Sequence, residues 1–371
     1  MLQSVYVNRQ VIGKTGSGKG TKALLGRLDI ELTERCNNNC RHCCINLPDD
    51  DLSVQSRELR AEEVKNILRE AVSLGCLTVR FTGGEPFLRA DFAELYLFAR
   101  RLGLKVLLFT NATLITVHLA ELFSRIPPLE KIEVSVYGMK KTSYEAVTRM
   151  PGSFELAFRG INLLLKKNIP FVVKSALLPA NKAEIEEFER WAGMTVGMDK
   201  PPSYSMFFDL RCRREAKKNE LIKSLRVSPE EGLRVLSRGK DKYLKEVREF
   251  CSKFIRPGGD LLFTCGAGCG GGCVDAYGNF QACLQLRHPR TVYDLKKGSL
   301  QEALTNFFPA MREIRTDNQE YLGRCACCFL KGLCEQCPAK SWMEHGTLDT
   351  PVEYLCEIAH LRAEKFKENF E

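Results

Sequence analysis

The chain has 371 residues, of which 44% are hydrophobic and 27% charged, so it is long enough for an α/β core and a second, smaller module. Its 17 cysteines, with no basic-then-apolar secretion leader before them, argue against a disulfide framework and indicate metal binding. The formal net charge of +9 ignores metal-bound thiolates, and the smaller charge that remains once they are counted is too modest to indicate nucleic acid. No apolar run could span a bilayer. We therefore expect a cytoplasmic protein with no nucleic-acid partner and no membrane partner.

Residues 1–24 are predicted to be an N-terminal extension that contains a stretch similar to a phosphate-binding loop. This stretch, GKTGSGKGT at residues 13–21, reads G-x4-G-K. Gly20, however, stands where magnesium binding needs Ser or Thr, and the segment that follows has the pattern of a strand instead of a phosphate-binding helix. We interpret the stretch as a flexible connector.

Residues 25–210 alternate short apolar or β-branched runs with helical patterns, which indicates βα units around a parallel sheet. The predicted strands are LGRLDIEL (25–32), LTVRFT (77–82), KVLLFT (105–110), KIEVSV (131–136), FVVKSAL (171–177) and SYSMFF (203–208). Six βα repeats are fewer than the eight that close a barrel, so we expect an open, partial (βα)6 barrel. Its working face should be the edge where the strands end.

The first group of cysteines follows the first strand directly, in the stretch TERCNNNCRHCC. Cys36, Cys40 and Cys43 have C-x3-C-x2-C spacing, which can hold three irons of a [4Fe–4S] cluster and leave the fourth iron without a protein ligand. The alternative is a closed zinc site, but its fourth ligand would be Cys44, whose side chain points away from that of its neighbour. The spacing therefore favours an open iron–sulfur cluster.

This loop resembles that of the radical S-adenosylmethionine (SAM) superfamily, with His42 where that family usually carries an aromatic residue. The resemblance implies that the open iron binds SAM, and that the reduced cluster cleaves SAM to a 5′-deoxyadenosyl radical. The difficult step would then be performed by the cofactor. It also implies an electron donor such as flavodoxin or ferredoxin.

The second predicted strand leads into FTGGEP, which is similar to the GGEP segment that binds SAM in this family. Two glycines let the backbone approach a ligand closely, and Glu85 offers a charged acceptor to an amino group. Polar residues also end the third and fourth strands, at the rim where a barrel binds its ligands. The predicted SAM-binding residues are Gly83, Gly84, Glu85, Pro86, Asn111 and Ser135, with Lys174 and Arg149 as weaker candidates.

Residues 211–250 are predicted to be a helical linker, and residues 251–371 a cysteine-rich domain with a C-terminal helix. The basic run Arg211–Lys223 is interpreted as a solvated helix face, with contact to an acidic leader peptide as the alternative. Gly278, in AYGNFQ, predicts a hairpin turn that brings its flanking strands together. The cysteines here could form zinc ribbons or iron–sulfur sites.

The cysteine series resembles the SPASM extension of radical SAM enzymes, with one departure: two residues instead of three precede Cys337. The resemblance implies two auxiliary [4Fe–4S] clusters, and thus three clusters in all. Cys325, Cys328, Cys334 and Cys356 would hold the outer cluster. Cys265, Cys283 and Cys337, with either Cys269 or Cys273, would hold the inner one. The remaining thiols, which are interpreted as buried or bystander residues, are Cys44, Cys76, Cys212, Cys251 and Cys327.

The resemblance implies an enzyme that abstracts a hydrogen atom from a peptide or protein substrate, in crosslinking, oxidation or epimerisation of a ribosomal peptide. One alternative is modification of a small molecule or a tetrapyrrole by the same radical. Another is a non-catalytic iron–sulfur or zinc scaffold. No residue can be assigned from the sequence as catalytic acid or base.

Overall fold

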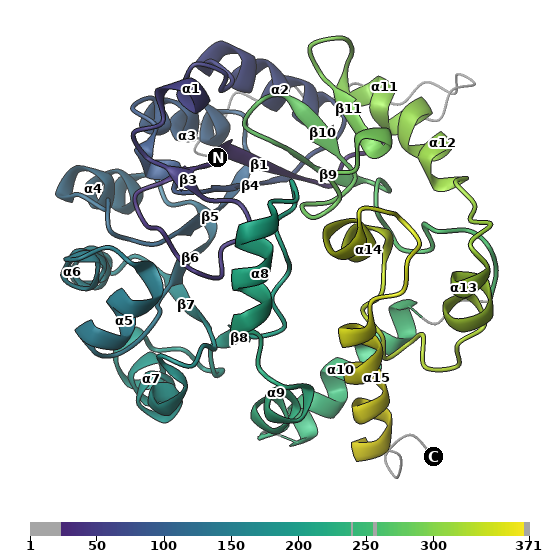
Figure 1. Ribbon diagram of the computed structural model, residues 1–371. Coiled ribbons are helices and arrows are strands. Elements are labelled where there is room, and N and C mark those ends of the chain that lie inside the picture. The colour runs from purple at the N-terminus through teal and green to yellow at the C-terminus, as the bar shows by residue number, and fades with distance from the viewer. Residues whose placement is uncertain (1–23, 239, 255–257, 367–371) are drawn as a thin grey trace.

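The computed structural model describes residues 24–238, 240–254 and 258–366 (Figure 1). The GKTGSGKGT stretch lies outside the described residues, as does all but the last residue of the predicted N-terminal extension. Among the described residues no helix combines the length and the apolar character that a membrane crossing needs.

One sheet of nine strands forms the centre of the molecule, in the order β11-β10-β9-β1-β4-β5-β6-β7-β8. The last six strands in this order are the six predicted from the sequence, and all of them pair in parallel with their neighbours. They are β1 (Arg27–Thr33), β4 (Thr78–Gly83), β5 (Lys105–Thr110), β6 (Leu129–Ser135), β7 (Phe171–Ala176) and β8 (Ser203–Ser205). The open α/β barrel architecture is therefore confirmed.

Helices between these strands cover the outer face of the curved sheet (Figure 1). In α2, Val64, Ile67, Leu68 and Ala71 lie on one buried stripe, because residues three and four apart share a face of a helix. They pack against strand residues such as Ile30 in the main core. The helices of this layer are α2 (Ala61–Ser73), α3 (Phe92–Arg101), α4 (Val117–Arg125), α5 (Lys141–Thr148), α6 (Ser153–Lys166) and α7 (Ile185–Trp191).

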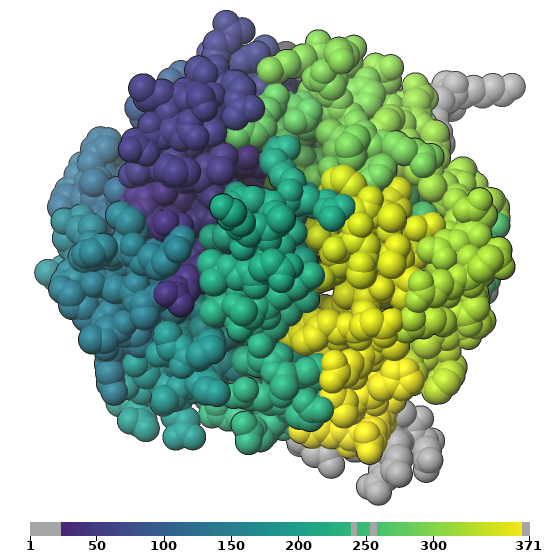
Figure 2. Space-filling model, viewed as in Figure 1, coloured from purple at the N-terminus to yellow at the C-terminus, as the bar shows by residue number. Residues whose placement is uncertain are grey.

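The C-terminal part of the chain closes the mouth of the barrel. The predicted linker forms helices α8 (Ala216–Leu225), α9 (Pro229–Leu236) and α10 (Lys240–Phe254). Figure 2 shows α8 on the viewer's face, directly against the yellow C-terminal residues. The last helices are α14 (Pro338–His345) and α15 (Glu353–Phe366). The short helical elements between α10 and α14 are η4 (Pro289–Thr291), α11 (Leu300–Glu302), η5 (Ala303–Phe307), α12 (Phe308–Arg312), α13 (Gln319–Tyr321) and η6 (Leu322–Ala326).

The predicted hairpin adopts its turn at Gly278, whose φ of 90° favours glycine. Its strands, β9 (Gly271–Val274) and β10 (Asn279–Gln281), pair antiparallel, and β11 (Val292–Asp294) continues beyond them. β9 also pairs in parallel with β1, with Cys273 opposite Asp29. Segments of the predicted core and of the predicted C-terminal domain thus share one sheet. The exact domain boundaries stay a prediction.

A buried ion network fixes the hairpin to the end of β1. The Arg287 guanidinium donates to both carboxylate oxygens of Glu31 at 2.6 Å and to Glu34 at 3.3 Å. Asp275 of the hairpin lies 3.8 Å from the same guanidinium, and all four side chains are 3% exposed or less. Because an unpaired charge at such depth is very unfavourable, these residues hold the C-terminal segment in a single position.

Candidate functional site

The loop that carries the first cysteines is closed by a two-residue pairing. β2 (Arg35–Cys36) pairs with β3 (Leu47–Pro48), and the Leu47 N–H donates to the Glu34 carbonyl at 2.8 Å. The Arg35 guanidinium donates to Glu58 at 2.9 Å, beside the short helix α1 (Leu52–Gln55). Cys36, Cys40 and Cys43 are therefore held on one compact loop just after β1.

The outer side of this loop is fastened to the end of α5. The backbone N–H of Asn39 donates to the Thr148 carbonyl at 2.9 Å, and that of Arg41 donates to the Val147 carbonyl at 3.2 Å. Arg149, a weaker SAM candidate from the sequence, donates through Nε to the Asn39 carbonyl at 2.8 Å. It is therefore placed to support the loop, and it is not among the residues that line the cavity.

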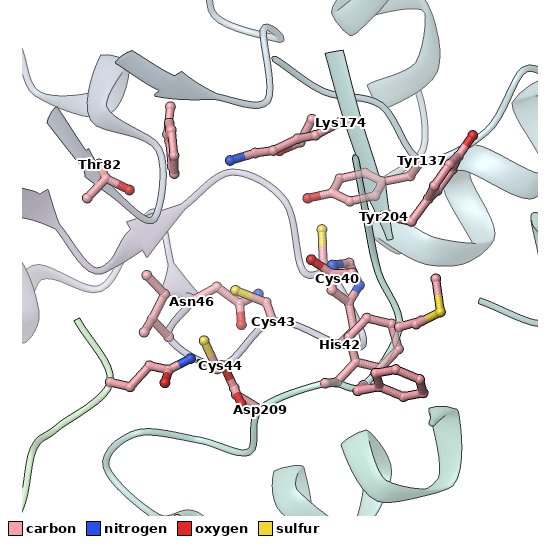
Figure 3. Close-up of a pocket in the computed structure, with 18 of the residues that line it drawn as sticks. Cys40, His42, Cys43, Cys44, Asn46, Thr82, Tyr137, Lys174, Tyr204 and Asp209 are labelled. Carbon is pink, nitrogen blue, oxygen red and sulfur yellow. Dashed lines mark hydrogen bonds between the residues drawn. The ribbon is translucent and has the colours of Figure 1, made fainter. Parts of the chain in front are cut away.

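The three predicted thiols line one cavity of about 620 Å³ at the edge where the parallel strands end. Figure 3 shows the Cys40 and Cys43 side chains at its wall. Burial raises the pKa of Cys40 to about 12, and the neighbouring Cys43 adds to this shift. Burial likewise raises the pKa of Cys36 well above its usual range. Such thiols release their protons when a positively charged metal core binds them.

The donor set fits a cluster better than a single ion. Among the described residues, no three His, Cys, Asp or Glu side chains converge closely enough to hold one metal ion. A four-iron cluster takes each thiolate at a different iron, so its ligands stand apart around a cube. Three thiols on one loop, facing one cavity, match the latter arrangement.

Gly83 and Gly84 are required by a close approach of two backbones. A Cβ atom on Gly83 would lie 2.1 Å from the Thr33 carbonyl oxygen, and one on Gly84 would lie 2.1 Å from the Arg35 carbonyl oxygen. Gly83 also has a φ of 122°. Both glycines line the cavity, so the turn after β4 presses against the entry to the cysteine loop and leaves bare backbone at the wall.

Glu85 is fully buried behind this turn, and it is not a lining residue. Its carboxylate accepts hydrogen bonds from the Asn111 N–H at 2.8 Å, from the Thr110 hydroxyl at 2.9 Å and from the Phe87 N–H at 3.2 Å. Burial raises the pKa of Glu85 to about 7, and these donors oppose the shift. Pro86, which begins the short helix η1 (Pro86–Leu88), also lies behind the lining.

Asn111 and Ser135 line the cavity, as does Lys174 from β7. The Asn111 amide donates to Asn37 Oδ1 at 3.0 Å and lies 3.7 Å from Cys36 Sγ. A continuous path of hydrogen bonds thus joins Glu85, Asn111 and the cysteine loop. The Lys174 ammonium points into the cavity (Figure 3) and lies 3.2 Å from Glu133.

Several wall residues were not predicted from the sequence. The Tyr137 hydroxyl hydrogen-bonds with the Cys40 thiol, and the His42 ring packs 5.2 Å from the rings of both Tyr137 and Phe208. Burial lowers the pKa of His42 to about 4, so its imidazole is neutral. Asp209 follows β8 and accepts hydrogen bonds from Lys340 and Gln285. Only the position of Tyr137, two residues beyond Ser135 at a strand end, could have indicated a role.

The predicted outer set of cysteines meets at one small cavity of about 60 Å³, which Cys325, Cys328, Cys334 and Cys356 all line. Cys265, Cys283 and Cys337 line a second cavity of about 630 Å³, together with Cys334. Cys269 is exposed and Cys273 is fully buried on β9, and neither lines this cavity. The structure therefore brings together the outer four thiols and three of the inner set.

The remaining thiols are divided between buried and accessible positions. Cys76 and Cys212 are buried, and Cys327 is exposed. Cys44 hydrogen-bonds with Cys212 and lines the main cavity, so it is nearer to the site than the sequence predicted.

The open parallel α/β barrel carries a three-thiol loop directly after its first strand, and the three thiols line one cavity. Residues 30–192 match the radical SAM superfamily. The chain is 26% identical to an AdoMet-dependent heme synthase of Methanosarcina barkeri, over 85% of this chain and 92% of that protein. It is 31% identical to a PqqA peptide cyclase of Gluconobacter oxydans, over 42% of this chain and 43% of that one.

Among solved structures, SuiB of Streptococcus suis bound to S-adenosylmethionine has the same fold, with a TM-score of 0.65 and 18% identity over 90% of this chain and 77% of that one. SuiB has also been solved bound to the precursor peptide SuiA. Residues 30–192 therefore form a radical SAM domain, and a cysteine-rich C-terminal region follows it. Members of this family bind a [4Fe–4S] cluster and SAM.

Proposed function

We propose that this protein is a radical SAM enzyme that abstracts a hydrogen atom from a side chain of a peptide or protein. The observation that carries this proposal is the convergence of three thiols, a bare glycine turn and the polar ends of three strands on one cavity. Cys36, Cys40 and Cys43 would hold the catalytic cluster. When bound, the cluster and SAM supply the radical, and the chain's own residues bind, orient and exclude water.

Some residues at the cavity would contact SAM directly, and others would hold those residues in place. The backbone of Gly83 and Gly84 and the side chains of Asn111 and Ser135 are the groups in direct reach of a ligand. Glu85 supports Asn111 through the Asn111 N–H, and Pro86 fixes the turn after it. We therefore assign Glu85 a positioning role, in addition to the acceptor role that the sequence predicts.

The cavity leaves room for a peptide side chain as the group that reacts. Pockets for drug-sized ligands measure about 300–1,000 Å³, so a cluster and SAM together would take a large share of the cavity of about 620 Å³. A single side chain from an extended peptide would need little of the remaining space. The peptide-bound structure of SuiB supports the same class of substrate.

We also propose that the C-terminal region is a SPASM-type domain with two auxiliary [4Fe–4S] clusters. Cys325, Cys328, Cys334 and Cys356 fit the outer one, since they line one small cavity. Cys265, Cys283 and Cys337 fit the inner one, and either Cys269 or Cys273 would complete it after a local movement. These clusters would accept an electron or bind the substrate during turnover.

One observation favours a second candidate, the modification of a tetrapyrrole. The AdoMet-dependent heme synthase is similar to this chain over 92% of its own length, whereas the peptide cyclase is similar over 43%. The same radical chemistry would then act on a tetrapyrrole.

The deciding experiment offers the reduced enzyme both substrates. Protein reconstituted without oxygen should bind about twelve irons, four for each cluster. The reconstituted protein would be incubated with SAM and dithionite, either with peptides encoded near its gene or with an iron-bound tetrapyrrole. The masses of the products would be measured by mass spectrometry. A mass change in a peptide supports the first proposal. A change only in the tetrapyrrole overturns it in favour of the second.

A further inference from the structure

A group of positive side chains lies on the outer side of the cysteine loop. This basic face consists of Arg41, Arg149, Lys217 and Lys218, of which the first three are exposed. None of the four makes an ion pair with any carboxylate among the residues that the structure describes. By contrast, Lys141 at the start of α5 and Lys223 near the end of α8 are both paired.

Two of these cations touch the loop itself. The Lys218 ammonium donates to the Cys40 carbonyl at 2.9 Å, and the Arg149 guanidinium donates to the Asn39 carbonyl at 2.8 Å. The basic face is therefore within one residue of a proposed cluster ligand. Arg211 also donates to a carbonyl of this loop, that of Asn46 at 3.2 Å, but the Arg211 side chain is buried.

The positive charges of the basic face also repel one another. Burial lowers the pKa of Lys218; the Cys43 thiol opposes this shift, and Arg211 and Arg149 add to it. Lys217 and Lys218 lie in the first turn of α8, which has no acidic residue there and where positive charge opposes the helix dipole. A partner that brings negative charge would relieve this repulsion.

The two sides of the loop have different neighbours. The inner side, with Cys40, His42 and Cys43, lines the cavity where SAM and the substrate would meet. The outer side, at Asn39 and Arg41, is exposed beside α5 and α8, and α8 lies on the face seen in Figure 2. A partner on the outer side can approach the cluster without entering the cavity.

We propose that the basic face is the docking site of an acidic one-electron donor protein, a flavodoxin or ferredoxin. This inference rests on the proposed function. Each cleavage of SAM consumes one electron: the donor is oxidised by one electron, the cluster is reduced, and the electron breaks the bond between sulfur and C5′. Methionine and the 5′-deoxyadenosyl radical result. A reduced donor must therefore bind the enzyme again for every uncoupled cleavage of SAM. Complementary charges on donor and enzyme increase the rate of such association.

The test compares a protein donor with a small reductant. The variant Arg41→Glu/Lys217→Glu reverses two charges that make no side-chain bond to the loop. The control, Arg125→Glu/Lys131→Glu, reverses two exposed cations without ion pairs in the described chain; Lys131 lies on β6 four residues before Ser135, toward the opposite end of the sheet. Release of 5′-deoxyadenosine would be measured with reduced flavodoxin and, separately, with dithionite.

We expect the charge-reversed variant to raise the KM for flavodoxin at least about tenfold, the scale of electrostatic steering, while the rate with dithionite changes less than about twofold. The control should change neither. The wild-type rate with flavodoxin should fall as salt is added. If the charge-reversed variant also releases no 5′-deoxyadenosine with dithionite, the neutral variant Arg41→Gln/Lys217→Gln replaces it. A raised KM for flavodoxin in the neutral variant, together with the salt dependence of the wild type, would then support the inference.

An unchanged KM for flavodoxin would overturn the inference. So would a variant whose KM rises only for the peptide substrate, because the face would then bind an acidic leader. Loss of 5′-deoxyadenosine in the wild type with both reductants would instead refute the proposed function. The two failures are therefore distinguishable.

Discussion

Glu85→Gln tests how the turn after β4 is held. Glutamine keeps the shape of the side chain but replaces one acceptor oxygen by an amide donor. That amide would face one of three donors that now point at Glu85: the Asn111 N–H, the Thr110 hydroxyl and the Phe87 N–H. Leaving a buried donor unsatisfied costs about 1–3 kcal/mol, so at about pH 6 the variant should be less stable than the wild type.

The pH dependence of stability should change as well. Burial raises the pKa of Glu85 in the folded protein from 4.5 to about 7. A raised carboxyl pKa means that its contribution to stability is present below the unfolded pKa and is lost as the pH rises through about 7. Between about pH 6 and about pH 8 the wild type should lose about 1.3 kcal/mol through this group, and the variant should lose none of it.

The assay is urea unfolding of the cluster-free wild type and variant across this pH range. Glu184→Gln is the matched control, since Glu184 is also buried and accepts from the Met139 N–H at 2.6 Å and the Ser143 hydroxyl at 2.9 Å. The difference between wild type and Glu85→Gln should shrink as the pH rises. A constant difference would show that Glu85 does not titrate in this range, and the reasoning from burial would be wrong.

Three further predictions follow from the packing around the site. Arg287→Met should destabilise the fold by about 3–5 kcal/mol, because the buried Glu31 loses its cation, whereas Glu34 and Asp275 keep Arg213; denaturant unfolding measures this, and a loss below about 1 kcal/mol would contradict the network. Gly84→Ala should reduce iron retention at the first cluster, since its Cβ would meet the Arg35 carbonyl, whereas Gly193→Ala, with no neighbour nearer than 4.0 Å, should not. Cys325→Ala/Cys328→Ala should lower substrate turnover and remove about four irons, whereas uncoupled release of 5′-deoxyadenosine should continue. Unchanged turnover with the outer cluster absent would refute a catalytic role for that cluster.

Much of the fold was predictable because its strands are short apolar or β-branched runs between helical patterns. In β1 apolar and charged residues alternate, and Leu28, Ile30 and Leu32 are all 1% exposed or less, as expected of residues that share one face of a strand. The pairing of β9 with β1 was not predictable. It joins residues more than 240 positions apart, and the stretch around Cys273 is rich in glycine and carries no strand-like alternation.

The candidate site, too, was predictable from the sequence only in part. Cysteine spacing and the GGEP turn predicted residues that meet at one cavity, because each motif is local and follows a strand. The buried position of Glu85 was missed, since sequence does not show which way a side chain at a turn points. Asp209 and Lys340 were missed because their pairing depends on how two distant segments pack.

The central claim is that Cys36, Cys40 and Cys43 hold the cluster that cleaves SAM. Its most direct test is the amount of 5′-deoxyadenosine formed by anaerobic protein with SAM and dithionite, measured together with bound iron. Wild type should form 5′-deoxyadenosine and methionine. The variant Cys36→Ala/Cys40→Ala/Cys43→Ala should form neither while losing about four irons. Undiminished 5′-deoxyadenosine in that variant would contradict the account.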